Sequence, residues 1–399
     1  MSTPLTIRPI DAADYRAFVA DFPQTSFLQM PEWAPVKTEW TPENLGWFDA
    51  NDTLVAVALV LHRSLPVLKK TLAYIPDGPI WAWDANDAPA VLEPLRDYLK
   101  AKGAFLIRMG PPVVQNRWPG EQIRRAVAAD TGGSIDQQHP DELKHTSADD
   151  LAAEQKLAAQ LASQLKALGW QEPSVSDDFE AGQPQFQARI PLRDAEGQQL
   201  SVDEVLSRMD QSSRRQTRKS TRTGVEVSHG TEADFDQWKA LFDETAERDG
   251  FLGRPADYFT TMYRELNAAN PGSCVLYLAR AAAENDENAP EGTLLAAAIF
   301  IREAKAAWYL YGASSNDYRK LGAPRRLQLA MIEDAIEAGC DYYDLGGISA
   351  TLQKDHELAG LTRFKTTMGA DVVRTLGEWD LPLNKVLTKA FEVYMDRRG

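Results

Sequence analysis

The sequence predicts an α+β protein made of two similar domains in tandem. Its 399 residues, 44% of them apolar, exceed what one hydrophobic core usually serves, so two domains of ordinary size are expected. The order of predicted elements gives a second reason, because strand, helix, antiparallel strands, helix and strand occur once in each half. A duplicated α+β domain would leave such a recurrence, although the halves share little identity side by side.

The spacing of apolar residues defines the elements of each half. In the first half, strands are expected at 5–7, 54–62, 71–75 and 105–109, and helices at about 12–21 and 89–101. In the second half, helices are expected at 234–248, 256–267 and 324–338, and strands at 275–279, 294–301, 307–312 and 342–345. The stretch 116–180 between the halves is polar and acidic apart from a charged helix at 148–168, so we interpret it as an insertion plus linker.

Charge and composition exclude several classes of protein. With 43 basic and 58 acidic residues, the net charge of −15 opposes unspecific attraction to polyanions, so any contact with nucleic acid must be local. No run approaches the roughly 18 apolar residues of a membrane span, and the start lacks a signal region, which predicts a cytoplasmic protein. The five scattered histidines form no metal-binding pattern, and neither a Gly-x-Ser-x-Gly elbow nor a Walker loop occurs. An enzymatic reaction would therefore be expected to need neither a metal nor a covalent enzyme intermediate.

The segment Leu361–Gly369 places one cation, Lys365, in an apolar stretch that ends in glycine. It follows a second glycine-containing segment, Tyr342–Gly347. Burying an ammonium group costs several kcal/mol unless a charge answers it, so this lysine is either part of a structural salt bridge or a stabiliser of an anion. Both interpretations remain open at this point.

A second cationic feature is the segment Arg208–Arg222, in which six basic residues minus one acidic residue leave +5. On a helix, four of these basic residues share one face: Arg215, Arg218, Lys219 and Arg222. Arg214 lies next to that face. Such a stripe could bind the phosphates of RNA or of a pyrophosphate. The alternative is a solvated basic helix packed beside acidic loops.

A third cationic feature is the loop that carries Arg319 and Gly322 ahead of the helix at 324–338. Pro324 suits a first helical turn, and free amides near Gly322 would point at a ligand anion with the help of the helix dipole. The loop is similar to the Arg-x-x-Gly-x-Gly/Ala loop with which GCN-related acetyltransferases hold a pyrophosphate. An ordinary capped helix is the alternative.

Seven segments, taken in order, resemble the Fem family of nonribosomal peptidyltransferases, which attach amino acids from aminoacyl-tRNA to the stem peptide of peptidoglycan precursors. The resemblance runs from about Phe27 to Gly377. Its carriers are Gln29–Trp33 with Lys37, Tyr74–Pro79, Arg214–Val225, Thr245–Phe251 with Arg254, Tyr309–Ser314, Tyr343–Gly347 and Phe364–Gly369.

The resemblance implies a fold of two acetyltransferase-like domains packed around a cleft. The first domain would span 1–180 with its polar insertion, the second would span 181–370, and the tail and helix at 371–399 would return to the first domain. The predicted helices between Asp234 and Asn267 are too short for the long helical arm of some members, so an armless chain is expected.

The resemblance also implies roles for individual residues. Lys365, directly after Phe364, would lie near the reacting carbonyl and stabilise the oxyanion, while Asp344 is either the nearest acid or a turn residue that caps amides. The cleft would be lined by Trp33, Lys37, Arg248, Arg254 and Tyr311. Where many members have Asp-Pro after the strand at 105–109, this chain has Gly110 and Pro111, so no general base can be named there.

The implied reaction joins an amino acid from aminoacyl-tRNA to the amine of a peptidoglycan precursor, either a UDP-linked muramyl peptide or lipid II. No cofactor is expected, and the chain is expected to be a cytoplasmic monomer. Contact with the inner face of the plasma membrane is left open, because the helix at 381–398 could lie on a membrane or dock onto the first domain. The alternatives are an N-acyltransferase that uses acyl-coenzyme A through the Arg319 loop, or a binding protein without catalysis.

Overall fold

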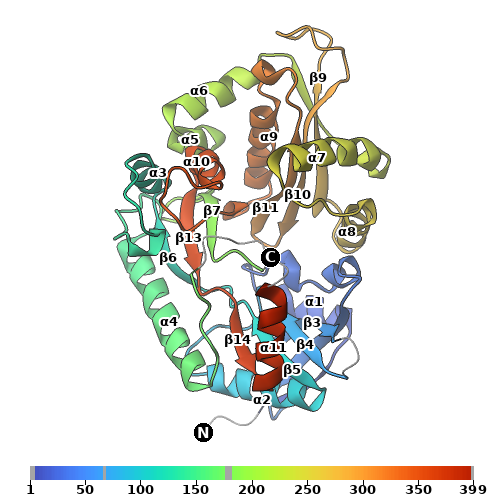
Figure 1. Cartoon of the computed structure of the whole chain (residues 1–399), viewed down its shortest axis with the longest axis vertical. Helices are drawn as coiled ribbons and strands as arrows, with labels where there is room; N and C mark the ends of the chain where they lie inside the picture. The colour runs from blue at the N-terminus through green and yellow to red at the C-terminus, as the bar shows by residue number, and fades with distance from the viewer. Residues whose placement is uncertain (1–4, 66–68, 176–181, 397–399) are drawn as a thin grey trace. The chain divides into compact units, whose positions relative to one another are not determined.

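The computed structural model describes residues 5–65, 69–175 and 182–396, which divide into two compact units (Figure 1). Unit 1 contains Met1–Arg117, Ala148–Phe186 and Val373–Gly399, and unit 2 contains Trp118–Ser147 and Gln187–Val372. The described residues form two sheets accompanied by helices, so the predicted α+β class with two units in tandem is confirmed.

Unit 1 is built on a six-stranded sheet in the order β1-β2-β3-β4-β5-β14. The strands are β1 (Thr6–Pro9), β2 (Thr41–Phe48), β3 (Leu54–Ser64), β4 (Thr71–Ile75), β5 (Ala104–Met109) and β14 (Trp379–Pro382). Neighbouring strands are antiparallel except for β4 and β5, which are parallel. Sequence reasoning missed β2, because only its last four residues are buried and its first four include proline, glutamate and asparagine, which strands disfavour.

The helices of unit 1 bury one apolar face each. They are α1 (Ala12–Val19), α2 (Ala88–Ala101), α4 (Ala148–Ala167), α11 (Lys385–Asp396) and the short helices η1 (Phe27–Gln29) and η2 (Pro31–Val36). Leu92, Leu95 and Leu99 of α2, at helical spacing, join Leu161 and Leu165 of α4 in the main core. The tail belongs to this unit, since β14 pairs with β5, and Leu387 and Phe391 of α11 pack against the cluster of Leu72, Phe105 and Leu106.

Unit 2 is built on an eight-stranded sheet in the order β6-β13-β7-β12-β11-β10-β9-β8, and the boundary between the units falls within β6, β7 and β13. The strands are β6 (Val114–Trp118), β7 (Phe186–Pro191), β8 (Val225–His229), β9 (Cys274–Ala281), β10 (Leu294–Glu303), β11 (Ala306–Ser314), β12 (Tyr342–Gly347) and β13 (Asp371–Thr375). Strands β11 and β12 are parallel, whereas β7 runs antiparallel to β12.

The helices of unit 2 are α3 (Gly120–Ala128), α5 (Val202–Arg208), α6 (Gln211–Ser220), α7 (Phe235–Asp249), α8 (Ala256–Ala269), α9 (Ala323–Glu337) and α10 (Ala359–Thr367), with η3 (Ile135–Gln137), η4 (Glu232–Asp234) and η5 (Arg319–Leu321). Three of them, α7, α8 and α9, lie within two residues of the ranges that the sequence predicts. Helices α7 and α8 contain 15 and 14 residues. This segment of the described chain thus has the short helices expected of an armless protein.

The segment Trp118–Ser147 groups with unit 2, whereas the sequence had placed it in an insertion of the first domain. Its helix α3 packs against α10 of the same unit. Arg124 donates to the carbonyl of Thr366, and the amide of Ile135 donates to the carbonyl of Ala350 at 2.8 Å. These contacts join residues more than 200 positions apart, and composition alone could not indicate them. In the part of the chain that is described, no helix combines the length and apolar character that crossing a membrane requires.

Candidate active site

Lys365 lies on α10 with only 6% of its surface exposed. Its Nζ donates a hydrogen bond of 2.6 Å to the carbonyl oxygen of Gly347, at the end of β12. Burial lowers the pKa of Lys365 from 10.5 to about 8, and the nearby carboxylate of Asp344 opposes that change. At pH 7 roughly nine-tenths of the side chain is still protonated by this value.

This environment bears on the two interpretations of Lys365. Among the described residues, no carboxylate oxygen lies within 4.0 Å of its Nζ, so the ammonium is not held in a close ion pair. An ammonium group has three N–H donors, and the carbonyl of Gly347 uses one of them. A charged group with remaining donors is suited to meeting negative charge that forms next to it.

The end of β12 holds Asp344 in a structural arrangement beside this lysine. Asp344 is 2% exposed, and its Oδ1 accepts a hydrogen bond of 2.6 Å from the amide of Gly346. Its Oδ2 accepts from Nε of Arg189 on β7 at 3.0 Å. Gly346 has φ of +83°, a left-handed conformation that favours glycine. Of the two roles considered for Asp344, these contacts favour the turn residue over the proton acceptor.

Phe364 precedes Lys365 on α10 and is half-buried. The guanidinium carbon of Arg325, on α9, lies 5.7 Å from the centre of the Phe364 ring. The same arginine donates to Sδ of Met368 at 3.0 Å. Both contacts tie α9 to α10, so Phe364 helps to position the helix that carries Lys365.

Tyr311 stands in an aromatic cluster built from α7, α8 and β11. Its ring lies 5.0 Å from that of Phe259 and 6.1 Å from that of Phe242, and its hydroxyl lies 3.1 Å from the hydroxyl of Tyr258. Tyr311 has φ of +50°, which is strained for a bulky side chain and is often found at functional sites. Arg254 places its guanidinium carbon 5.4 Å from the Tyr258 ring. Arg254, Tyr258 and Tyr311 are therefore neighbours in unit 2, and their role in binding a substrate stays a prediction.

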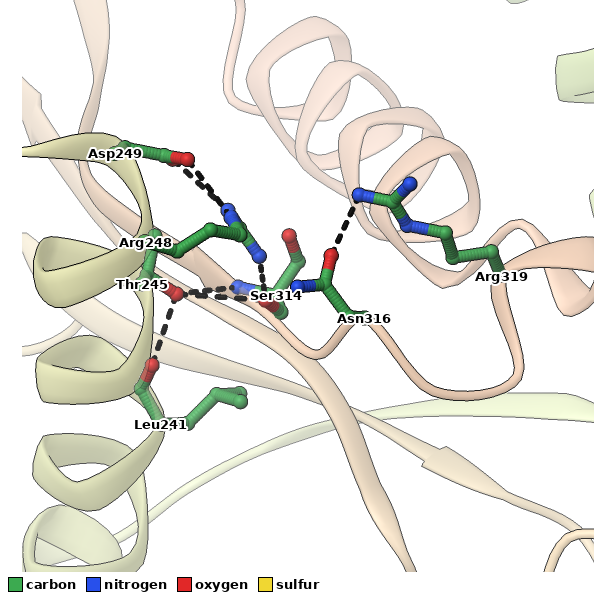
Figure 2. A network of polar contacts seen from close by, with 7 residues as sticks. All are labelled: Leu241, Thr245, Arg248, Asp249, Ser314, Asn316 and Arg319. Atoms are coloured by element: carbon green, nitrogen blue, oxygen red, sulfur yellow. Dashed lines mark hydrogen bonds and ion pairs between the residues drawn. The ribbon is translucent and has the colours of Figure 1, made fainter.

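Figure 2 shows Arg248 turned toward the loop that follows β11. Its NH1 donates to the carbonyl of Ser314 at 2.7 Å, and its Nε donates to the carboxylate of Asp249 at 2.7 Å. Thr245 secures the same loop by accepting from the amide of Ser314 at 3.1 Å. Since Asp249 already compensates the charge of Arg248, Arg254 is the better candidate of the two for contacting a substrate phosphate.

Arg319 lies on the other side of that loop and donates to Oδ1 of Asn316 at 2.5 Å (Figure 2). Gly322 has φ of +70° and precedes α9 as predicted, but its amide donates to the carbonyl of Arg319 at 3.1 Å. The amide of Lys320 donates to the carboxylate of Glu287 at 3.1 Å. The expectation of a free amide is thus corrected for Gly322, and the carboxylate of Glu287 lies beside this loop.

The basic stripe lies on α6, whose buried face carries Ser213, Thr217 and Ser220. The exposed basic residues of the helix are Arg215, Arg218 and Lys219, with Arg214 half-buried. Arg218 is partly compensated, because its NH2 lies 2.9 Å from the carboxylate of Asp203. The helix ends at Ser220, so Arg222 lies in the following turn and not on the predicted helical face.

In unit 1, Trp33 and Lys37 lie on and next to η2. Trp33 is 2% exposed and meets Phe27 edge to face at 5.1 Å, while Nζ of Lys37 lies 4.9 Å from the centre of the Trp33 ring. The neighbouring Gln29 donates to the carbonyl of Pro76 at 2.6 Å. This bond joins two of the segments, Gln29–Trp33 and Tyr74–Pro79, that sequence reasoning had singled out separately.

Sequence reasoning missed a half-buried acid in unit 1, Glu378. The hydroxyl of Tyr74 donates to its Oε1 at 2.5 Å, and Gln183 donates to the same hydroxyl at 3.3 Å. Burial raises the pKa of Glu378, while Tyr74 and Arg108 oppose the change. A Cβ on Gly110 would lie 3.7 Å from Cγ of Glu378, so this acid stands beside the position where the expected Asp-Pro is missing. No local signal marks it, because the fold alone brings β14 next to β5.

The two sheets with their helices place the chain among mixed α/β proteins that are built from two units in tandem. The chain belongs to the FemAB family, which it matches over residues 10–281 and 272–395, so the resemblance seen in the sequence is confirmed. It is 24% identical to the lipid II:glycine glycyltransferase of Staphylococcus saprophyticus subsp. saprophyticus, over 94% of this chain and 92% of that protein. It is also 24% identical to the protein of that name from Staphylococcus aureus (strain USA300), over 95% and 93%.

Among solved structures, the crystal structure of FemX has a similar fold. Its TM-score is 0.76 at 23% sequence identity, and the match covers 97% of this chain and 99% of FemX. At 23% sequence identity, this similarity shows a shared fold alone.

Proposed function

We propose that this chain transfers an amino acid from aminoacyl-tRNA to the stem-peptide amine of a peptidoglycan precursor. The product is the peptide bond of an interpeptide bridge, and the acceptor is lipid II or its UDP-linked muramyl peptide precursor. The observation that carries the proposal is the buried ammonium of Lys365, held against the Gly347 carbonyl within a family segment. The names of the two staphylococcal relatives support the choice of acceptor.

The reaction needs little more than positioning and one charge. The acceptor amine attacks the ester carbon, the bond to the ribose oxygen breaks, and the proton lost by the amine is balanced by the proton that the ribose oxygen gains. Because the ester is already activated, proximity and oxyanion stabilisation supply most of the rate enhancement. Lys365 donates to the oxyanion, with Phe364 and Gly347 positioning its helix and its amine.

The other cations bind the two charged substrates. Arg254 beside Tyr258 and Tyr311 contacts acceptor phosphates, with Arg248 supporting the same wall. In unit 1, Lys37 beside Trp33 is a further candidate for binding substrate. The exposed residues of α6 hold phosphates of the tRNA, with Arg214 and Arg222 at their margins. The chain works as a cytoplasmic monomer, and it uses no cofactor.

The test is transfer of a labelled amino acid from a full panel of charged tRNAs to lipid II and to the UDP-linked precursor. Lys365→Ala should lower the rate about a hundred- to thousandfold, the usual effect of losing one oxyanion donor. Lys166→Ala is the matched control, because this lysine is 57% exposed on α4 and pairs with Glu172. Absence of transfer with every tRNA and both acceptors would refute the proposal.

An acyl-coenzyme A dependent N-acyltransferase is less well supported. Its pyrophosphate would bind the Arg319–Ala323 loop, where the Gly322 amide is engaged and the Glu287 carboxylate receives the Lys320 amide. Titration with coenzyme A, followed by tryptophan fluorescence, should therefore show no saturable binding.

A further inference from the structure

Helix α11 presents two contrasting faces within unit 1. Its inner face packs on the core through Leu387 and Phe391. Its outer positions are Lys385, Val386, Lys389, Ala390 and Val393. Val386 is 78% exposed and Val393 is 44% exposed, and among the described residues only six large apolar side chains are exposed to such a degree. Two of those six thus lie on one helical face.

The outer face of α11 separates apolar from basic residues. Val386, Ala390 and Val393 follow the i, i+4, i+7 spacing of one helical stripe, and Lys385 and Lys389 form the i, i+4 stripe next to it. Glu392 is exposed and continues the lysine stripe at the i+7 position, so the stripe carries two lysines and one glutamate. The face is amphipathic in its own right, apart from the side that the core covers.

Two more exposed lysines lie close to the core cluster on which α11 packs. Lys69 and Lys70 are exposed at the start of β4, and the amide of Leu65 donates to the carbonyl of Lys70 at 2.9 Å. Leu65 packs against the cluster that also receives Leu387 and Phe391. The neighbouring Arg63 is paired with Glu39 at 3.0 Å and adds no net charge. Lys69 and Lys70 thus lie near the core cluster that α11 covers, and Lys385 and Lys389 lie on α11 itself, in a protein whose net charge is −15.

We propose that the outer face of α11 docks the protein reversibly onto a bilayer that contains anionic lipids. Lysines near such a surface are attracted by its negative potential, and exposed valines can enter the boundary between headgroups and acyl chains. A protein partner fits less well, since interface cores are enriched in aromatic residues and arginine and depleted in lysine. The inference deepens the proposed function, because a lipid-linked acceptor lies at a membrane surface.

The test is co-sedimentation of the full-length protein with vesicles of phosphatidylcholine alone or with one quarter phosphatidylglycerol, at low and high salt. The wild type should bind the anionic vesicles and be released by salt. Each lysine near the surface is worth roughly fivefold in partitioning, so Lys385→Glu with Lys389→Glu should weaken binding more than tenfold. Val386→Glu with Val393→Glu should abolish it. Val175→Glu, at a valine that is 38% exposed and outside α11, is the control that should bind normally.

Three results would overturn the proposal. The first is no binding of anionic vesicles by the wild type, and the second is binding by the Val386→Glu, Val393→Glu variant that equals that of the wild type. The third is a dimer in sedimentation velocity that this variant dissociates, since a second copy would then occupy the face. The vesicles contain no acceptor, so failure of the proposed transferase activity would not affect this measurement. Transfer to the soluble UDP-linked acceptor should be unchanged in the α11 variants.

Discussion

The Nζ of Lys365 lies 2.6 Å from the carbonyl oxygen of Gly347, and this bond joins the middle of α10 to the end of β12. A backbone carbonyl fixes the position of the ammonium without neutralising it. The carboxylate of Asp344 favours the protonated form of Lys365, but its oxygens accept hydrogen bonds from Arg189 and from the amide of Gly346. The resulting charge is buried, positioned and only partly compensated.

The pH dependence of the transfer rate should report this ammonium. Because burial lowers the pKa of Lys365 to about 8, the protonated form that stabilises an oxyanion is lost above that pH. The rate constant for the chemical step should therefore fall as pH rises through about 8. Lys365→Arg keeps its charge in this range, so its rate should be lower but free of the fall near pH 8. If the rate falls near pH 8 to the same extent in the wild type and in Lys365→Arg, the fall must come from another group.

Stability should depend on the same group with a defined sign. The pKa of Lys365 is 10.5 in the unfolded chain and about 8 in the fold, so between these values the unfolded state binds more protons. The free energy of unfolding should therefore rise with pH in this window, by at most about 3 kcal/mol. Urea denaturation of wild type and Lys365→Met at pH 7.5 and pH 10 tests this, because the variant should lack the rise. An equal rise in the variant would contradict the assignment.

The left-handed turn at Gly346 should be costly to change. A Cβ there would lie 3.6 Å from Nζ of Lys365, so space is adequate, but φ of +83° is strained for an L-residue by about 1–2 kcal/mol. Gly346→Ala should lower the free energy of unfolding by that amount. Gly360→Ala is a matched control, since this glycine lies in α10 with no atom within 4 Å of its added Cβ, and alanine there should stabilise the helix. Equal effects of both substitutions would exclude backbone strain as the cause.

Sequence reasoning found the features that repeat locally. Amphipathic helices such as α2 and α9 and buried strands such as β10 carry their period in the sequence. The segment with Lys365 was recognisable because it holds one cation in an apolar stretch, and the family resemblance then implied a role for that cation. The partner of Lys365 was not predictable, because the Gly347 carbonyl meets it only after α10 packs beside β12. Arg222 does not lie on the predicted basic stripe, because α6 ends at Ser220. Beyond that end, the Thr223 hydroxyl donates to the carbonyl of Leu321 at 2.6 Å, and the sequence could not indicate a contact between residues 98 positions apart.

Glu378 should make the free energy of unfolding fall with pH, whereas Lys365 should make it rise. Its pKa is raised above 4.5 in the fold, so the folded state binds this proton more tightly than the unfolded state. The free energy of unfolding should therefore fall as pH rises from about 4.5 through the folded pKa. In Glu378→Gln this fall should disappear in melting experiments between pH 4 and pH 8.

Asp380→Asn controls for the Glu378 experiment. Asp380 makes two bonds of 2.8 Å with Arg108, and Arg108 also acts on Glu378. The Asn variant should be less stable overall but should keep the fall that is assigned to Glu378. If the fall of the unfolding free energy with pH is lost in Asp380→Asn but persists in Glu378→Gln, the fall comes from the ion pair of Asp380 with Arg108.

The exposed residues of α6 should determine how binding of charged tRNA depends on salt. Each phosphate contact contributes about 0.7–0.9 to the slope of log K against log salt, so Arg215→Ala with Lys219→Ala should reduce the slope by roughly 1.5. Filter binding between 50 and 300 mM salt measures it, and Lys239→Ala on α7, whose lysine pairs with Asp243, is the control that should keep the slope. If the double variant binds tRNA with the wild-type slope, α6 is a solvated basic helix, and the tRNA phosphates must be held by other residues.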